Sequence, residues 1–508
     1  IPIYVDADIL PGDSVKMRMA EIIRMQTPIF PVMDNAYMDI YFFFVPHRIV
    51  WEHWKEFWGE NNLTAWEQQV PYEIPQIEAP ASTGWTEGTI ADYMGIPTGV
   101  DDISVNHLPF RSYVKCWNDW FRDENLKDPA FIQADETTLT GANTGNYVTA
   151  AQLGAKPLKV AKYHDYFTSA LPAPQKGPSV NLPLGNSAPI IGTDNVYDAA
   201  YLDSNLVDKE LMIAKSAGGL DLTSTSLTSL RSGKEIGLAA DLSNAIGATI
   251  NQLRQAFAVQ AFYEAQSRGG SRYIEFIKNI FGVTSPDGRL QRSEYLGGTR
   301  VQINMDQVLQ TSSTDAVSPQ GNTAAFSCTV NTEEDLFTHS FTEHGTLIGL
   351  ACIRTDHTYQ QGINRMWSRK KWTDFYVPQL ANLGEVPILN KELYAQGTSV
   401  VDADGNVVDE QVFGYQEAWA DYRYMPSRVS GEMRSSYAQS LDAWHYADDY
   451  NTLPTLSSGW IDETEENIDR TISVQHSTAN QFFGDFYFDP IYVRPMPVYS
   501  IPAMLNHF

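Results

Sequence analysis

The run at residues 33–48, MDNAYMDIYFFFVPHR, constrains the fold more than any other part of the chain. Side chains alternate between the two faces of a β-strand, so its residues fall into two sets. One set is wholly apolar and comprises Ala36, Met38, Ile40, Phe42 and Phe44. The other set is mostly aromatic and comprises Tyr37, Asp39, Tyr41, Phe43 and Val45. The run therefore predicts a strand that is covered on both sides and ends at Pro46, because proline donates nothing to a ladder.

Composition limits the class of protein. The chain has 508 residues, of which 43% are hydrophobic and 12% aromatic, which is enough for a sizeable core. At about 150 residues per domain the length suggests about three domains, but a single all-β domain with long insertions fits as well. The three cysteines have no CxxC spacing and favour a reducing compartment. We find no signal peptide and no apolar run near the roughly 20 residues of a membrane helix.

The net charge of −27, from 35 basic and 62 acidic residues, argues against a general nucleic-acid-binding protein. Neutralisation of phosphates needs a basic surface, which most of this chain lacks.

Further strands are predicted along the chain. Residues 1–30 alternate in character up to a turn at Pro11-Gly12 and are interpreted as an extended arm. Residues 346–354, TLIGLACIR, predict a buried strand. Val400-Val401 and Val407-Val408 flank a hairpin turn. The segment 482–508 is interpreted as a last strand followed by a proline-rich tail that contacts a neighbour.

Helical spacing of apolar residues appears in four segments. They are 51–58, 110–121, about 243–268 and 271–282. In the third segment Leu253 and Phe257 belong to the apolar stripe. In the fourth, Ile274, Ile277 and Phe281 are expected to point inward, with Gly282 at the end.

Residues 184–244 have a different composition from the rest of the chain. They are rich in Gly, Ser, Thr, Asn and Asp, with few aromatic residues. Such a polar insertion is typical of surface material. The sequence leaves two roles open for this insertion: contact with the host, or a surface loop without function.

Several long phrases resemble the major capsid proteins of the microviruses, small icosahedral single-stranded DNA phages, and are most similar to the gokushovirus branch. The first is PVMDNAYMDIYFFFVPHRIVWEHWKEFWGEN, followed in order by LPFRSYVKCWNDWFRDENL and YHDYFTSALPAPQKGP. Next come TINQLRQAFAVQAFYEAQSRGGSRYIEFIKNIFGV and QVFGYQEAWADYRYMPSRVSGEMR. The last is FFGDFYFDPIYVRPMPVYSIPAML. The resemblance spans nearly the whole chain and is weakest at 184–244 and near 311–325.

The resemblance implies a fold and a function. The fold is mainly β, an eight-stranded antiparallel jelly roll of the viral capsid type with long inter-strand insertions that contain helices. Residues 1–508 then form one elaborated protomer, with 184–244 as a variable surface insertion at the threefold axes that contacts the host receptor. Pentamers of the protein are expected to close a T=1 shell around a circular single-stranded DNA genome and a small basic packaging protein. The expected location is the virion, assembled in the bacterial cytoplasm, and we expect no cofactor, no catalytic residue and no metal site.

One segment combines basic and aromatic residues. It contains Arg365, Trp367, Arg369, Lys370, Lys371 and Trp372. Two interpretations stay open: charge and stacking could hold single-stranded DNA, or the segment could anchor a contact between subunits.

Other constellations favour structural roles. His339, Glu343, His344, Asp356 and His357 could suggest a metal site, but the spacing is not HExxH, and His339 and His344 would face opposite sides of a strand. Residues 402–406 (DADGN) hint at a calcium loop, yet Val407 and Phe413 stand where that loop needs Gly and Glu, so we predict a turn. There is no GxSxG motif and no recognisable nucleophile, and we predict no enzyme.

Two alternative functions remain. A secreted carbohydrate-binding jelly-roll protein would use Trp and Tyr rings as sugar platforms. A phage attachment protein outside the capsid would differ by forming trimers instead of pentamers.

Overall fold

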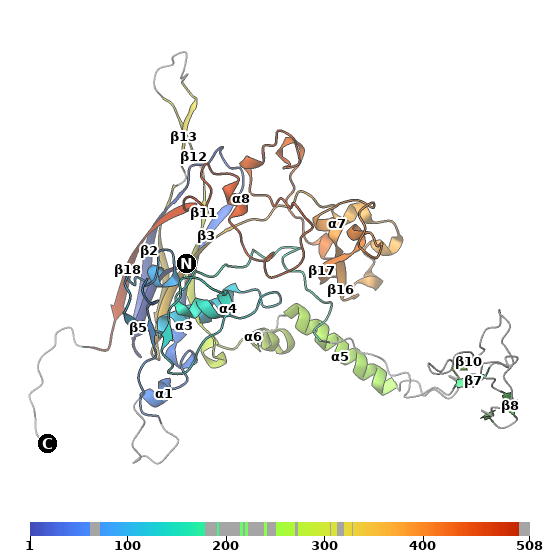
Figure 1. Ribbon diagram of the computed structural model, residues 1–508, viewed down its shortest axis with the longest axis horizontal. Helices are drawn as coiled ribbons and strands as arrows, with labels where there is room; N and C mark the ends of the chain where they lie inside the picture. The colour runs from blue at the N-terminus through green and yellow to red at the C-terminus, as the bar shows by residue number, and fades with distance from the viewer. Residues whose placement is uncertain are drawn as a thin grey trace, which may run out of the picture. The chain divides into compact units, whose positions relative to one another are not determined.

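The structure is a computed structural model (Figure 1) that describes residues 1–60, 72–177, 190–192, 214–216, 219–221, 238–240, 250–269, 273–304, 306–311, 320–327 and 329–496. The chain divides into two compact units. The first comprises Ile1–Lys176 and Ala265–Phe508, and the second comprises Gly177–Glu264. Within the described ranges, most of the strand pairing is antiparallel, so the prediction of a mainly β protein is confirmed.

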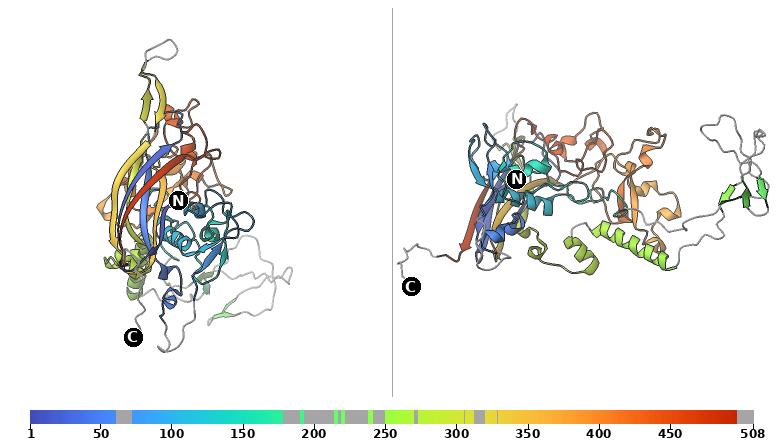
Figure 2. Two further views of the ribbon diagram at one scale, coloured as in Figure 1. Left: turned by 90° about the vertical axis from the view of Figure 1, so that its left-hand side faces the viewer. Right: turned by 60° about the horizontal axis from the view of Figure 1, so that its bottom comes forward.

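Two sheets dominate the first unit (Figure 2). The larger sheet has the strand order β1-β15-β3-β11, with β1 at Pro2–Ile9, β15 at Gly345–Thr355, β3 at Ala36–Pro46 and β11 at Glu294–Ile303. The smaller sheet has the order β14-β2-β18, with β14 at Thr329–Ser340, β2 at Ser14–Met25 and β18 at Phe482–Val493. All neighbours in both sheets are antiparallel.

Strand β3 is buried on both faces, as the alternation at 33–48 predicts. Met38, Ile40, Phe42 and Phe44 join the core that β2 and β15 also line. Phe43 and Val45 point to the opposite side, into a second core built on Trp51, Trp85 and helix α3 at Leu108–Cys116. β3 and β15 pair without a register shift, from Ala36 opposite Thr355 to Pro46 opposite Gly345. The central strand and the predicted buried strand at 346–354 are therefore confirmed.

The segment 1–30 is not an extended arm. Its two halves are strands of different sheets, and the turn between them lies at Gly12, whose φ is +95°. The prediction failed because the alternation continues beyond that turn. Val15, Met17, Met19, Ile23 and Met25 are all buried between the sheets. Burial of this apolar row holds β2 in place.

The remaining elements are short. In the first unit the further strands are β4 (Gln76–Glu78), β5 (Ser104–Asn106), β6 (Leu139–Thr140), β12 (Asp306–Leu309), β13 (Thr323–Ser327), β16 (Glu385–Leu389) and β17 (Val412–Glu417). Its helices besides α3 are α1 (Trp54–Phe57), α2 (Ile90–Tyr93), α4 (Tyr147–Ala150), α6 (Tyr273–Phe276), α7 (Asn390–Leu393) and α8 (Glu466–Asp469). The second unit contains β7 (Ile190–Gly192), β8 (Ala214–Ser216), β9 (Gly219–Asp221) and β10 (Leu238–Ala240). Helix α5 spans Ile250–Gly269.

The predicted helices are present, with differences in what they bury. Helix α3 continues as a π-helical turn at Trp117–Phe121, and its predicted apolar face is buried or half-buried. Helix α5 forms from Ile250 onward, and the predicted residues before it lie outside the described ranges. Helix α6 continues as a π-helical turn at Ile277–Phe281, which Gly282, at φ +68°, ends. However, Phe281 is exposed, so the prediction that it points inward is wrong. Phe257, in the apolar stripe of α5, is exposed as well. An apolar stripe identifies the face that favours burial, but not the molecule that buries it.

Two predicted segments lie mostly outside the described residues. Of the insertion 184–244, the structure describes only the four three-residue strands β7 to β10. The tail beyond residue 496 is not described either.

Candidate interaction surface

The basic-aromatic segment 365–372 lies in the long connection after β15. A 3-10 turn at Arg365–Ser368 begins at Asn364, whose side chain accepts a hydrogen bond from the Met366 backbone N–H at 3.0 Å. A second turn is fixed by Asp374, whose carboxylate accepts the backbone N–H groups of Lys370 and Lys371, each at 2.8 Å. These hydrogen bonds hold the pKa of Asp374 below its usual value. The segment thus has a defined backbone that presents its side chains in fixed directions.

The two arginines of the segment are engaged within the chain. Arg365 forms an ion pair with the buried carboxylate of Glu392, Nε to Oε1 at 3.3 Å. Arg369 pairs with Asp421, and its guanidinium lies over the Tyr422 ring at 4.3 Å from the centroid. A cation held between a carboxylate and an aromatic ring is already satisfied. We therefore assign a structural role to the side chains of Arg365 and Arg369.

The two lysines and two tryptophans face outward. Trp367 and Trp372 are each 72% exposed. Lys370 and Lys371 make no ion pair within 4 Å to any residue that the structure describes. Exposed indoles next to available cations are suited to contact another molecule. The structure thus separates the six predicted residues into an anchored pair and four available side chains.

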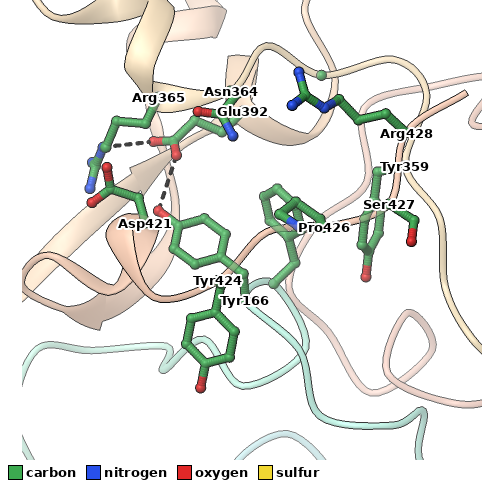
Figure 3. Close-up of a pocket in the computed structure, with 12 residues that line it drawn as sticks. Tyr166, Tyr359, Asn364, Arg365, Glu392, Asp421, Tyr424, Pro426, Ser427 and Arg428 are labelled. Atoms are coloured by element: carbon green, nitrogen blue, oxygen red, sulfur yellow. Dashed lines mark hydrogen bonds and ion pairs between the residues drawn. The ribbon is translucent and has the colours of Figure 1, made fainter. Parts of the chain in front are cut away.

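A small pocket lies beside this segment (Figure 3). Its wall includes Arg365 and Glu392, and Tyr166 donates its hydroxyl to Glu392 at 3.1 Å. The cavity volume is about 50 Å³, whereas pockets for small molecules begin near roughly 300 Å³. The pocket is therefore too small for a sugar ring or a nucleobase.

The residues considered for a metal site are dispersed among separate partners. His339 faces Glu294 at 3.9 Å, Glu343 pairs with Arg48 at 2.6 Å, and the His344 ring stacks on Trp58 at 4.7 Å. Asp356 lies near the Tyr37 hydroxyl, and His357 belongs to a different cluster. No group of three or more His, Cys, Asp or Glu side chains that could hold a metal ion occurs in the described part of the chain.

The segment at 402–406 forms the predicted turn. Val408 donates its backbone N–H to the Val400 carbonyl at 3.0 Å, which closes the hairpin. Asp402 accepts the backbone N–H groups of Asp404 and Asn406, each at 2.9 Å. The Asp402 carboxylate is thus used by its own loop, and the turn interpretation is confirmed.

The buried carboxylate of Asp39 is the centre of an ionic cluster that no local pattern in the sequence predicts. Its Oδ1 accepts Arg300 Nε at 2.7 Å, and its Oδ2 accepts Tyr163 Oη at 2.7 Å and Arg354 Nε at 3.1 Å. Burial alone would raise the pKa of Asp39, but these hydrogen bonds and the Arg354 charge outweigh it and lower the pKa. The signal in the sequence was a lone carboxylate within an otherwise apolar and aromatic strand.

His357 forms a second buried cluster. Its Nδ1 lies 3.1 Å from an Asp448 oxygen, and its Nε2 lies 3.0 Å from a Glu463 oxygen. Both ring nitrogens must donate, so the imidazole is protonated. Burial alone would lower the pKa of His357, but Asp448 and Glu463 raise it to about 9.

This cluster predicts a loss of stability at alkaline pH. The pKa of His357 is about 9 in the folded chain and about 6.5 when unfolded, so its contribution is complete below pH 6.5 and is lost as pH rises through 9. We expect wild type to be more stable than His357→Gln at pH 6.5, with the gap in melting temperature shrinking toward pH 10. Thermal unfolding of both proteins across this range measures the gap. A gap that does not change with pH would contradict the assignment.

Comparison with known proteins places the chain among the structural coat proteins of phages. It is 43% identical to capsid protein VP1 of Spiroplasma virus 4, over 99% of this chain and 92% of the relative. It is 42% identical to capsid protein VP1 of Bdellovibrio phage phiMH2K, over 100% and 92%, and 36% identical to that of Chlamydia phage 1, over 99% and 92%. The chain belongs to the capsid protein (F protein) family, whose model matches residues 1–504.

Family membership confirms the resemblance to gokushovirus capsid proteins and the structural, non-enzymatic role. It leaves the carbohydrate-binding and attachment-protein alternatives without support. Among the described residues, no helix is long and apolar enough to cross a bilayer.

Proposed function

We propose that this protein is the major capsid protein of a virion, assembling through pentamers into a T=1 icosahedral shell around a circular single-stranded DNA genome. The observation that carries the proposal is the family match over residues 1–504. Shells of this kind close through repeated contacts between identical subunits, so each contact can be weak. Assembly in the bacterial cytoplasm agrees with the absence of CxxC spacing among the cysteines.

A nuclease experiment tests the enclosed genome. Particles purified after assembly in host cells are treated with nuclease, and the protected nucleic acid is extracted. We expect the extracted nucleic acid to be DNA that a single-strand-specific nuclease degrades, although the same nuclease does not degrade it inside intact particles. Protected RNA, or no protected nucleic acid in intact particles, would contradict it.

The order of strands supports a jelly roll. In an eight-stranded jelly roll, one sheet holds the first, eighth, third and sixth strands in that order, and the second and seventh pair in the other sheet. β1, β15, β3 and β11 follow the first pattern, and β2 with β14 follows the second. In the described ranges no strand takes the fourth or fifth place, and β18 lies at the edge of β2. We therefore propose a jelly roll in which the long insertion between β3 and β11 replaces two strands.

We propose that Lys370, Lys371, Trp367 and Trp372 contact the enclosed DNA. With a net charge of −27, the chain can only assist a small basic packaging protein in this task. The exposed lysines supply charge for phosphates, and the indoles supply stacking surfaces for bases. Arg365 and Arg369 stabilise the conformation of the segment through their ion pairs with Glu392 and Asp421.

Charge reversal tests this contact. For Lys370→Glu with Lys371→Glu, we expect weaker binding of single-stranded DNA by the dissociated subunit. The plot of log affinity against log salt should become shallower by about 1.4, the loss of two phosphate contacts. Fluorescence anisotropy with an oligonucleotide measures this. The control is Lys55→Glu with Lys278→Glu, which makes the same charge change elsewhere. Equal weakening in both variants would favour the subunit-contact interpretation.

We propose that residues 184–244 form a surface insertion that contacts the host, within one elaborated protomer of residues 1–508. The polar composition of the insertion supports this. Deleting residues 190–240 is expected to leave particle assembly intact and to reduce adsorption to host cells, measured by counting bound particles. Loss of particles in this variant would contradict the surface assignment.

A further inference from the structure

Strand β18 lies at the edge of its sheet. It pairs with β2 over its full length, from Phe482 opposite Met25 to Val493 opposite Ser14. No described strand pairs with its other side, and Figure 2 shows it in red beside the blue β2. Alternate residues anchor it to its own core, because Phe482, Phe486, Phe488 and Tyr492 pack between the sheets. The strand is therefore a fixed part of this subunit whose outer surface is available.

The outward side chains of β18 form an apolar strip. The strip consists of Phe483, Tyr487, Ile491 and Val493, all of which are exposed, with Tyr487 at 67%. The exposed Ile22 of β2 lies beside it, opposite Asp485. Four large apolar side chains in one row are an unusual surface for a chain that stays a monomer.

Apart from Ala20 and Ile22, the neighbouring strands present mainly polar side chains on this face, and several of them form ion pairs. Lys16 pairs with Asp335 at 3.2 Å, and Arg18 pairs with Asp335 at 3.1 Å and with Asp489 at 3.6 Å. Most of these ion pairs thus join β14 to β2, one reaches Asp489 in β18, and the large apolar side chains gather at the edge. Because the ion-paired side chains lie mainly on β14 and β2 and the large apolar side chains lie on β18, the strip is the part of this sheet face that is suited to a protein contact.

The charges around the strip favour a protein partner over a nucleic acid. Two copies of a chain with net charge −27 repel each other, so they can meet only where carboxylates are few or neutralised. At the strip Asp489 shares Arg18 with Glu333 and Asp335, so its charge is only partly offset. Asp485 makes no ion pair with any residue that the structure describes. A nucleic acid fits poorly, because Lys16 and Arg18 are already held in ion pairs.

We infer that the strip Phe483, Tyr487, Ile491 and Val493 is buried against a second copy of this chain in the assembled shell. The inference rests on the proposed function, because it needs a protein that associates with itself. The contact is made by side chains and not by addition of a strand to the edge. Pro490 lacks a backbone N–H, and Asp485 and Asp489 place charge along the edge, which are the features that block strand addition.

Tyr487→Glu tests the inference, with Thr338→Glu as the matched control. Thr338 is also exposed on the outer face of this sheet, in β14, so the control adds the same charge away from the strip. We expect Tyr487→Glu subunits to fold, with a circular dichroism spectrum and melting temperature close to wild type, and to yield at least tenfold fewer particles by sedimentation. Thr338→Glu should assemble like wild type. Wild-type particle yield from Tyr487→Glu would overturn the inference.

Thiol labelling gives a second, independent measurement. In Tyr487→Cys, maleimide should react at least tenfold more slowly in particles than in dissociated subunits, after subtraction of the labelling of the unmodified protein. Equal rates would mean that the strip stays exposed in the shell and would overturn the inference. If wild type forms no particles, the proposed function itself fails. If wild type and Tyr487→Glu both assemble, only this inference fails.

Discussion

Replacing Asp39 with asparagine is expected to lower the free energy of unfolding of the subunit by about 3–5 kcal/mol. The Asp39 carboxylate is fully buried and is the shared partner of Arg300, Arg354 and Tyr163. Without its charge, the mostly buried guanidinium of Arg354 is left with no anion beside it, whereas the half-exposed Arg300 can still be solvated. Removing one partner of a buried ionic cluster costs far more than removing a surface pair, because the remaining charge cannot be solvated. Urea denaturation of the dissociated subunit measures the change.

Glu333→Gln is the control for this prediction. Glu333 pairs with Arg18 on the outer sheet face, where both side chains are well exposed, so we expect a change within about 1 kcal/mol. Asp39→Asn should also flatten the acid limb of the stability profile. The lowered pKa of Asp39 contributes stability that is lost as pH falls through that pKa. A loss for Asp39→Asn no larger than that for Glu333→Gln would contradict the role of the cluster.

Phe42→Ala is expected to cost about 3–5 kcal/mol, through lost burial and the cavity that remains. The Phe42 ring packs against Phe337 of β14 at 5.5 Å, Tyr4 of β1 at 5.9 Å and Phe488 of β18 at 6.2 Å between ring centroids. It therefore joins the two sheets at the centre of the core. Urea denaturation again gives the magnitude.

Phe375→Ala is the matched control, because it removes the same ring from a half-exposed position. Its expected loss is below about 1.5 kcal/mol, since most of the area removed is already in contact with water. If both variants lose the same stability, the two sheets do not share the core described here.

The sequence predicts a helix or strand well where the periodicity of its apolar side chains alone determines which of them are buried. Residues 33–48 alternate so regularly that the central strand, its two faces and its end at Pro46 follow from side-chain periodicity alone. The helix at Leu108–Cys116 follows from apolar spacing and from Pro109 in its first turn. The family resemblance, carried by long phrases, extends this to the class of protein.

Other features depend on groups far apart in the sequence and could not be predicted. Asp39 lies 261 residues from Arg300 and 315 from Arg354, and no local pattern joins them. The strand Ser14–Met25 was interpreted as part of an arm, because its partners β14 and β18 lie hundreds of residues away. Phe257 and Phe281 show the reverse case, in which a correct helical pattern does not tell which molecule covers the apolar face.

The basic-aromatic segment was only partly predictable. Its composition named all six residues, but the exposure of Trp367 and Trp372 is known only from the structure. The pairing of Arg365 with Glu392 and of Arg369 with Asp421 depends on residues 27 and 52 positions later, which the spacing within the segment does not reveal.

The most direct test of the capsid assignment is the size of the native assembly, measured by sedimentation velocity and electron microscopy of the purified protein. We predict closed shells with icosahedral symmetry, or pentamers that convert into such shells. A monomer that stays stable across salt and pH would contradict it.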